Sequence, residues 1–116
     1  MKMIHAIIRP ERLEAVQAEL RKVLDEQDHY RMTVQEVEGH GRQEGEVEYV
    51  RGRAIRPRLI ARLQVSVAIN PEYVDPAIEA IQRGARTGKV GDGKIFVLPL
   101  ERCVRIRTGQ EGADAI

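Results

Sequence analysis

Residues 59–84, LIARLQVSVAINPEYVDPAIEAIQRG, decide the fold because one strand pattern is followed directly by one helix pattern. Residues 59–69 alternate between apolar and polar side chains, which predicts a strand with one buried face. Residues from about 74 to 84 then carry apolar side chains at helical spacing, with Ile78 and Ile81 on one face. This stretch therefore predicts one half of a β-α-β unit.

The rest of the chain completes the pattern. Residues 1–9 have apolar side chains at every second position, and this strand is followed by a helix that begins at Pro10 and continues to about residue 24. Residues 32–38 predict the next strand. Beyond the second helix, residues 94–98 and 101–108 predict the last strands, with a break between them at Pro99.

The predicted order β-α-β-β-α-β is that of an α+β, ferredoxin-like sandwich, in which one sheet carries both helices on one face. We expect a single domain over residues 1–116, because a chain of this length fits one domain. The first strand is apolar on both faces. This suggests that the open face of the sheet is covered, and identical subunits are the expected cover.

Composition excludes several classes of function. The formal net charge is +1 and aromatic residues make up 3% of the chain, so we expect no nucleic-acid partner. No apolar run approaches the roughly 20 residues of a membrane helix, so we expect no membrane insertion. The opening MKMIHAIIRP lacks the features of a signal peptide. Cys103 is the only cysteine, which excludes an intramolecular disulfide and favours the cytoplasm.

Residues 39–57 show neither a strand nor a helix period, and a loop of this length in a small domain is usually functional. Its charges are segregated. The acidic half contains Glu44, Glu46 and Glu48, and the basic run that follows contains Arg51, Arg53, Arg56, Arg58 and Arg62. One interpretation is an arm whose basic half docks on an acidic partner. The alternative is a solvated hairpin that pairs with itself.

Residues 84–94, GARTGKVGDGK, predict an anion-binding loop between the second helix and the next strand. Its glycines allow successive N–H groups to face one concavity, and Lys89 and Lys94 add positive charge. The spacing is not that of a Walker A motif, and Val90 stands where Ser or Thr would hold Mg²⁺. An ordinary turn between helix and strand is the alternative.

Two further clusters add candidate anion ligands. Arg105 and Arg107 would share one face of a strand about 7 Å apart, so that both guanidinium groups reach neighbouring phosphates. A charged edge strand is the alternative. In residues 39–43, GHGRQ, the glycines allow close approach to a ligand, Arg42 is a phosphate candidate, and Gln43 offers an oxygen for Mg²⁺.

Four segments carry a resemblance to a known family. They are MKMIHAIIRPERLEAV (1–16), MTVQEVEGHGRQ (32–43), ARTGKVGDGKIFVLPLE (85–101) and VRIRTGQEGADAI (104–116). Together they resemble the PII signal-transduction proteins, the nitrogen-regulatory P-II family, over nearly the whole chain. The resemblance implies a homotrimer with a T-loop at about 39–58, a B-loop at about 86–94 and a C-loop at about 105–116.

The resemblance also implies three clefts between subunits in which ATP and ADP compete. Positions that match the family's nucleotide contacts are Thr33, Gly39, Gly41, Arg42, Gln43, Gly91, Asp92, Gly93 and Lys94, together with Arg105 and Arg107 from the neighbouring subunit. Many members also bind Mg²⁺ and 2-oxoglutarate. The matching positions here are Gln43 for Mg²⁺, and Gln43, Arg62 and Lys94 for 2-oxoglutarate.

The chain departs from the family at several of these positions. Arg62 replaces a lysine, and a planar guanidinium need not bind a small carboxylate in the same way. The tyrosine that many members uridylylate falls at Ile55, so we expect no such modification. The T-loop residues expected to contact a partner are Tyr49, Arg51, Arg53, Ile55, Arg56 and Arg58. The resemblance thus predicts a divergent member with a retained nucleotide site and a retargeted T-loop.

The resulting hypothesis is a sensor of ATP and ADP, not an enzyme, that controls a nitrogen- or carbon-metabolism enzyme or a transporter through T-loop contact. A transporter partner would recruit it from the cytoplasm to the membrane. The alternatives are a PII-like sensor of another small anion such as bicarbonate, a small phosphatase or ATPase, and a trimeric metal-binding relative. No nucleophile elbow or HExxH spacing supports the last two.

Overall fold

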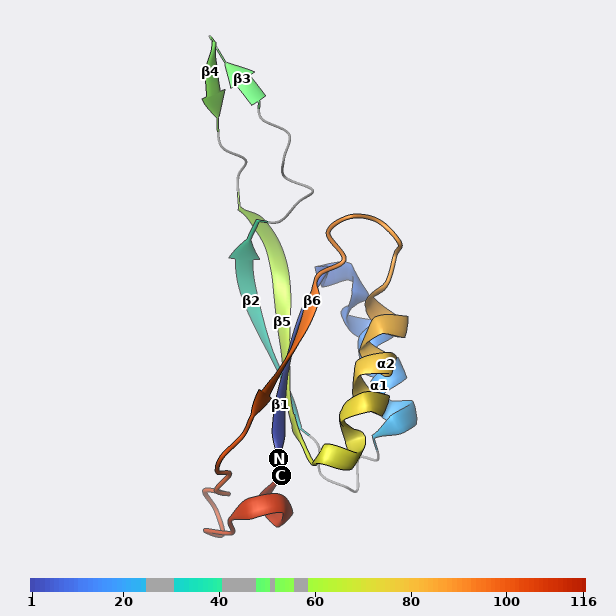
Figure 1. Ribbon diagram of the computed structural model, residues 1–116, viewed down its shortest axis with the longest axis vertical. Helices are drawn as coiled ribbons and strands as arrows, with labels where there is room; N and C mark the ends of the chain where they lie inside the picture. Colours follow the sequence, from blue (N-terminus) through green and yellow to red (C-terminus); the bar gives the residue numbers. More distant parts are fainter. Residues whose placement is uncertain (25–30, 41–47, 51, 56–58) are drawn as a thin grey trace.

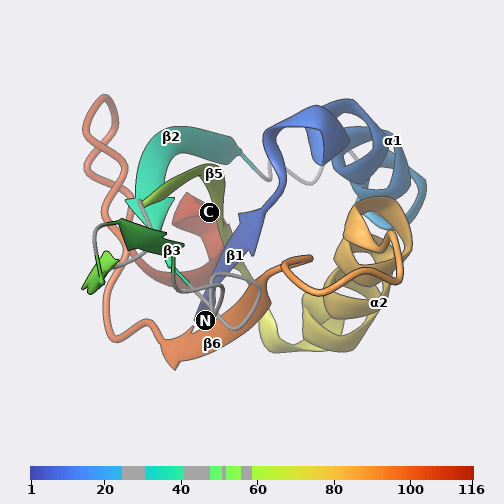
Figure 2. The ribbon, with the colours of Figure 1, turned by 90° about the horizontal axis from the view of Figure 1, so that it is seen from above.

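The computed structural model describes residues 1–24, 31–40, 48–50, 52–55 and 59–116. They form a four-stranded sheet, two α-helices on one of its faces, and a separate two-stranded hairpin (Figure 1). Viewed from above, both helices lie on the same side of the sheet (Figure 2).

The sheet has the predicted ferredoxin-like topology. Its strands are β1 (Lys2–Ile8), β2 (Met32–Gly39), β5 (Ile60–Ile69) and β6 (Lys94–Pro99), in the order β2-β5-β1-β6. All three neighbouring pairs are antiparallel. Helix α1 (Leu13–Val23) follows β1 along the chain, and helix α2 (Val74–Ala85) lies between β5 and β6. The α+β class predicted from the sequence is confirmed.

The core lies between the sheet and the helices, and the period-2 pattern of the central strands creates it. In β1 the alternate residues Ile4, Ala6 and Ile8 are at most 1% exposed. The other fully buried large side chains are Val16, Leu20, Val65, Val67, Ile69 and Ile81. Each large side chain contributes about 1.5–3 kcal/mol of burial free energy. This burial explains why β1 and β5 form the centre of the sheet.

The opposite face of the sheet carries a mixture of polar and apolar side chains. His5 Nδ1 lies 2.8 Å from Ser66 Oγ and 3.3 Å from Gln64 Nε2. On the edge strand β6, Phe96 is 50% exposed and Leu98 is 42% exposed. Cover by identical subunits therefore stays a prediction that the exposed apolar side chains favour.

Each α-helix begins with a short 3-10 turn that starts at a proline, over Pro10–Arg12 and Pro71–Tyr73. Proline fits there because its fixed φ suits the first helical position. Helix α2 continues one residue beyond the predicted end at Gly84. A Cβ atom on Gly84 would lie 2.6 Å from Val16 Cα, so this glycine allows the two helices to pack closely.

The prediction of a strand over residues 101–108 is wrong. Apart from one bridge between Val104 and Glu111, the segment is irregular and turns back on itself. The N–H of Gly109 donates to the Arg105 carbonyl at 2.8 Å, and the N–H of Arg105 donates to the Gln110 carbonyl at 2.8 Å. Gly109 has a φ of +73°, which lets this tight turn interrupt the extended chain.

The long loop is not wholly without regular structure. Strands β3 (Glu48–Val50) and β4 (Arg53–Ile55) pair as an antiparallel hairpin, with Gly52 at a φ of +76° in the turn. This pairing agrees with the self-paired hairpin, one of the two interpretations of the loop, and docking of its basic half on a partner stays a prediction. The hairpin lies beyond the end of the sheet where β2 stops and β5 begins (Figure 1).

Candidate functional site

The loop from α2 to β6 is built around the carboxylate of Asp92. One oxygen, Oδ2, accepts hydrogen bonds from the main-chain N–H groups of Thr87 and Gly88, each at 2.9 Å. The other oxygen, Oδ1, accepts from the Thr87 hydroxyl and from Arg9 Nε, the latter at 3.2 Å. These donors, and the Thr87 hydroxyl most of all, hold the pKa of Asp92 well below its usual value.

The loop therefore differs in one respect from the open nest expected from the sequence. Its glycines do adopt left-handed geometry, with φ of +85° at Gly88, +101° at Gly91 and +105° at Gly93. However, the N–H groups of Thr87 and Gly88 bond to Asp92 inside the loop. The concavity at this end is filled by the protein's own carboxylate, and Asp92 acts as the organiser of the loop.

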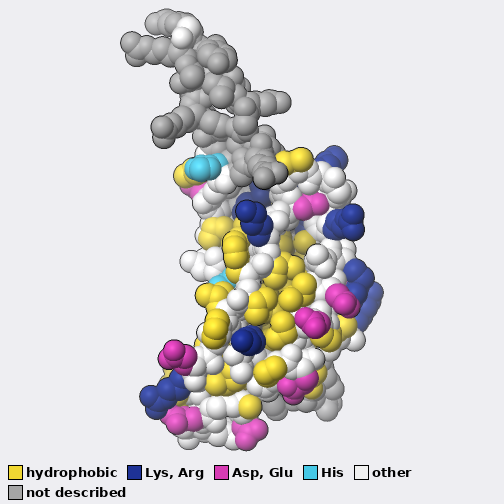
Figure 3. Space-filling view, in the orientation of Figure 1, with side chains coloured by type: hydrophobic (Ala, Val, Ile, Leu, Met, Phe, Trp, Pro, Cys, Tyr) yellow, Lys and Arg dark blue, Asp and Glu magenta, His cyan; other side chains and the backbone are white. Residues whose placement is uncertain are grey.

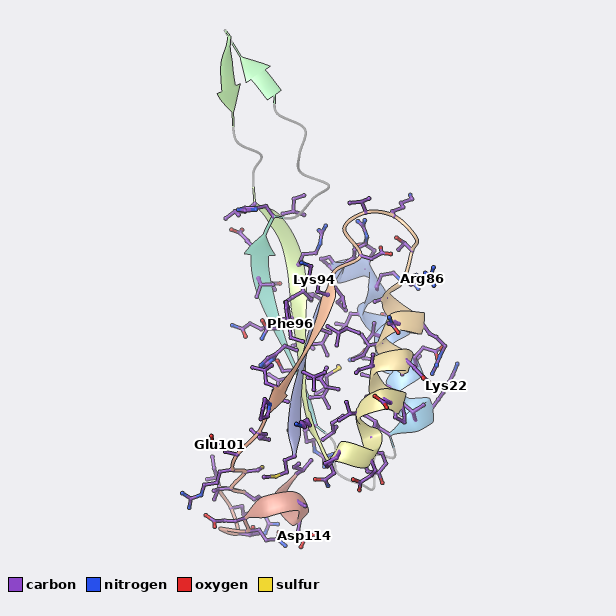
Figure 4. All side chains as sticks on the ribbon, in the orientation of Figure 1. Lys22, Arg86, Lys94, Phe96, Glu101 and Asp114 are labelled. Carbon is purple, nitrogen blue, oxygen red and sulfur yellow. The ribbon has the colours of Figure 1, made fainter. Side chains whose placement is uncertain are left out.

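The end of the loop is pressed against β1. A Cβ atom on Gly93 would lie 1.6 Å from the carbonyl oxygen of Ile7, so only glycine fits at this position. The next residue, Lys94, pairs with Ile7 at the start of β6. This contact fixes where Lys94 enters the sheet, at the start of β6 (Figure 4). Because its partner Ile7 lies between the core residues Ala6 and Ile8, alternation places the Lys94 side chain on the face turned away from the helices.

A cleft of about 1010 Å³ joins this loop to the root of the long loop. One wall is formed by residues 89–94, and the other by Val37, Glu38, Gly39 and His40 at the end of β2, with Arg62 of β5, Ile7 and Phe96. Three cationic side chains, Lys89, Lys94 and Arg62, line it beside two carboxylates, Glu38 and Asp92. The cleft thus offers an excess of positive charge next to apolar surface, which suits an anion attached to an apolar group.

Most of the predicted cleft residues that the structure describes come together. Gly39, Gly91, Asp92, Gly93, Lys94 and Arg62 all line the cleft. Thr33 does not, because it lies on β2 opposite Ser66, further along the sheet. Gly41, Arg42 and Gln43 lie outside the described residues, and with them the predicted Mg²⁺ ligand.

The partner-binding residues predicted in the long loop are only partly described. The backbones of Tyr49, Arg53 and Ile55 belong to the β3–β4 hairpin. The predicted contacts Arg51, Arg56 and Arg58 lie outside the described residues.

Arg105 and Arg107 do not meet the glycine loop within one chain. The loop precedes β6 and the two arginines follow it, so they lie toward opposite ends of the sheet (Figure 1). The strand that would have aligned the two guanidinium groups is absent from this described segment. Their expected place in the cleft of a neighbouring subunit stays a prediction.

Two arginines that support the site were missed in the sequence. Arg9 reaches across 83 positions to Asp92, and its Nη2 donates to the Val90 carbonyl at 2.8 Å. Arg12 Nε donates to the Gly84 carbonyl at 2.8 Å. Both residues lie within two positions of Pro10, and nothing in their local pattern indicates contacts at such separation.

A second hollow, of about 810 Å³, lies between α2 and the edge of β6. Its lining includes Ile78, Ile81, Ile95 and Val97, and hydrophobic side chains gather over this part of the surface (Figure 3). Among the described residues, no group of three or more His, Cys, Asp or Glu side chains could hold a metal ion. No helix in the described ranges is long and apolar enough to cross a bilayer.

Comparison with known proteins shows the family. The profile of the family "Nitrogen regulatory protein P-II" matches residues 1–110, and the chain belongs to this family of regulatory signal transducers. It is 46% identical over 118 residues to the nitrogen regulatory protein GlnK1 of Methanosarcina mazei, covering 100% of this chain and 97% of that protein. It is 45% identical to the nitrogen regulatory protein P-II of Azospirillum brasilense, with both chains covered completely.

A solved structure is similar in both fold and sequence. The crystal structure of Arabidopsis thaliana PII bound to citrate matches with a TM-score of 0.77 and 33% identity, covering 99% of this chain and 91% of that one. The resemblance seen in the four sequence segments is therefore confirmed at the level of family and fold.

An aspartate substitution tests the organisation of the glycine loop. Because the folded state lowers the pKa of Asp92, its ionised carboxylate stabilises the fold above the ordinary aspartate pKa of about 3.9, and this contribution is lost as the pH falls through the lower folded value. We expect Asp92→Ala to lower the free energy of unfolding by about 1 kcal/mol at pH 7, with a smaller difference below about pH 3. Urea unfolding at both pH values measures this, with the exposed Glu101→Gln as control. An equal loss at both pH values would contradict the assignment.

Proposed function

We propose that the protein is a homotrimeric regulator that senses ATP and ADP in its clefts and signals through the loop between β2 and β5. The observation that carries this proposal is the composition of the cleft. Its cationic wall, with Lys89 and Lys94, lies opposite Gly39 and His40, where the long loop begins. A ligand bound there touches the root of the loop directly.

The cleft fits a nucleotide in its chemistry. Lys89 and Lys94 supply positive charge for phosphates, and Ile7, Val37 and Phe96 supply apolar surface for a base. ATP and ADP place different charge beside the loop root, and each would favour a different loop ensemble. The effect is limited to the difference in their affinities for those ensembles. Arg105 and Arg107 of a neighbouring subunit would complete the phosphate site.

A regulatory role suits the cleft better than hydrolysis. Asp92, a carboxylate in the cleft wall, is already bonded to Thr87, Gly88 and Arg9, and its lowered pKa makes it a poor general base. We therefore propose protein contact as the output: a nitrogen- or carbon-metabolism enzyme or a transporter would bind the long loop. The protein would act in the cytoplasm, and a transporter partner would bring it to the membrane.

Two candidates exist for a second ligand that would bind beside ATP, and they are 2-oxoglutarate with Mg²⁺ and a smaller anion. Mg²⁺ and 2-oxoglutarate would join ATP through Gln43, Arg62 and Lys94. Arg62 favours the other candidate, a smaller anion such as bicarbonate, because its Nη1 already donates to the Ala61 carbonyl at 3.0 Å. A guanidinium folded back on its own backbone leaves less of its planar surface for a dicarboxylate.

Calorimetry of the wild-type protein with ATP and ADP tests the proposal. We expect both to bind, and we expect Lys94→Ala to weaken ATP binding by at least about 30-fold, because it removes a charged partner of the phosphates. Lys22→Ala is the matched control, since it removes the same charge on α1, where Lys22 pairs with Glu19. Equal ATP affinity in wild type and Lys94→Ala would contradict the site.

The same titrations separate the finer claims. Addition of Mg²⁺ with either 2-oxoglutarate or bicarbonate shows which anion tightens ATP binding. The double substitution Arg105→Ala and Arg107→Ala should abolish ATP binding while light scattering still reports a trimer. A monomer in the wild type would contradict the shared cleft.

A further inference from the structure

The segment after β6 is organised around the side chain of Arg105. Its Nη1 donates to Gln110 Oε1 at 3.0 Å. Its Nη2 donates to the main-chain oxygens of Asp114 at 3.3 Å and Ile116 at 3.4 Å. One guanidinium group thus holds both a turn and the last residues of this sequence, which lie nine and eleven positions away.

Main-chain contacts make the segment a compact unit. The N–H of Gly112 donates to the Cys103 carbonyl at 3.0 Å, and a short 3-10 turn over Gly112–Ala115 follows it. Ala115 in this turn is only 8% exposed. By contrast, the side chain of the neighbouring Ile106 is 99% exposed and does not pack into this unit.

We propose that Arg105 is a latch, and that phosphate binding at its guanidinium releases the turn at residues 112–116. This inference rests on the proposed function, which assigns Arg105 to a nucleotide phosphate. A guanidinium grips phosphate through pairs of adjacent N–H groups, and these include the groups that now bond to Gln110, Asp114 and Ile116. Phosphate oxygens carry more charge than the Gln110 amide and the Asp114 carbonyl, and they displace these neutral acceptors from the guanidinium.

The segment after β6 would then change conformation when the ligand binds. Binding at the cleft would act on the long loop of one subunit and, through Arg105, on the turn of the neighbouring subunit that supplies this arginine. The coupling must be reciprocal. If phosphate binding favours the open turn by a given factor, opening of the turn raises the phosphate affinity by the same factor. A substitution that weakens the closed turn must therefore tighten phosphate binding.

Gly112→Ala tests this reciprocity without touching Arg105. Gly112 has a φ of +81° and open space around the position of a Cβ atom, so alanine adds only backbone strain to the closed turn. We expect ATP to bind about threefold to tenfold more tightly to Gly112→Ala. Lys22→Ala is the control, because Lys22 lies on α1, outside the cleft, the long loop and the turn, and pairs with Glu19. Unchanged or weaker ATP binding in Gly112→Ala overturns the latch.

Hydrogen exchange gives a second readout on the wild type. We expect saturating ATP to speed exchange of the Gly112 and Ile116 amides, which donate to the Cys103 and Ala113 carbonyls. Slower exchange there on ATP binding overturns the latch while leaving the proposed function intact.

Failure of ATP binding by the wild type would be a different outcome, because it overturns the proposed function and the phosphate link together. The anchoring role of Arg105 is then judged without nucleotide. Arg105→Ala should speed exchange of the same two amides at least about tenfold, and Arg107→Ala, an exposed arginine two positions away, should not. Equal exchange in both variants overturns the anchor itself.

Discussion

Replacing Gly93 by alanine should lower the free energy of unfolding by at least about 3 kcal/mol. The new Cβ atom would lie 1.6 Å from the Ile7 carbonyl oxygen, which is a main-chain atom of the central strand β1 and cannot rotate away. The residue also keeps a φ of +105°, a conformation that alanine rarely adopts. Relief requires β6 to separate from β1 at its first pair, Ile7 with Lys94.

Urea unfolding at fixed protein concentration measures this loss, and Gly88→Ala is the matched control. Gly88 lies in the same loop with a φ of +85°, but the space around its Cβ position is open. We expect Gly88→Ala to cost only about 1 kcal/mol, the conformational part alone. If the two variants lost equal stability, the close approach of Gly93 to β1 would not be the cause.

The second large effect is expected at Gly84, where the usual rule for helices reverses. An alanine in place of glycine inside a helix ordinarily stabilises it by about 1 kcal/mol. At Gly84 the added Cβ atom would lie 2.6 Å from Val16 Cα and 2.8 Å from the Ala15 carbonyl oxygen. Because these are backbone atoms of α1, the helices must move apart, and we expect a net loss of about 3 kcal/mol.

Thermal and urea unfolding of Gly84→Ala measure this effect. Gln82→Ala is the control, since Gln82 is exposed on the same helix and its replacement should change stability by less than about 0.5 kcal/mol. Wild-type stability or better in Gly84→Ala would show that the helices accommodate the methyl group.

Sequence periodicity predicted the parts of the fold that local patterns control. The strand ending at Ile69 and the helix from Val74 are in place because alternation and helical spacing are strong over their whole length. Residues 101–108 also alternate, yet the turn at Gly109 and the side-chain bonds of Arg105 override the extended pattern. Alternation alone does not say whether a neighbouring strand is available.

The candidate site was predictable in composition but less so in its internal bonding. The sequence identified Lys94 and Gly39 through their loops and through the family resemblance, and the structure places both in one cleft. It assigned Asp92 to the ligand, which stays a prediction, and it did not indicate that the Asp92 carboxylate holds the loop together. The bond from Arg9 to Asp92 could not be found because 83 positions separate the two residues and only the folded chain brings them together.

The network around Asp92 also affects the entropy cost of binding a ligand in the cleft. Because Thr87, Gly88 and Arg9 already hold the wall that carries Lys89 and Lys94, little conformational entropy is lost there when an anion arrives. Most of the conformational entropy lost on binding is then lost by the opposite wall, where Gly39 and His40 lie. Under the proposed function, ATP and ADP would meet the same rigid wall, and the difference between them would act on Gly39 and His40, where the long loop begins.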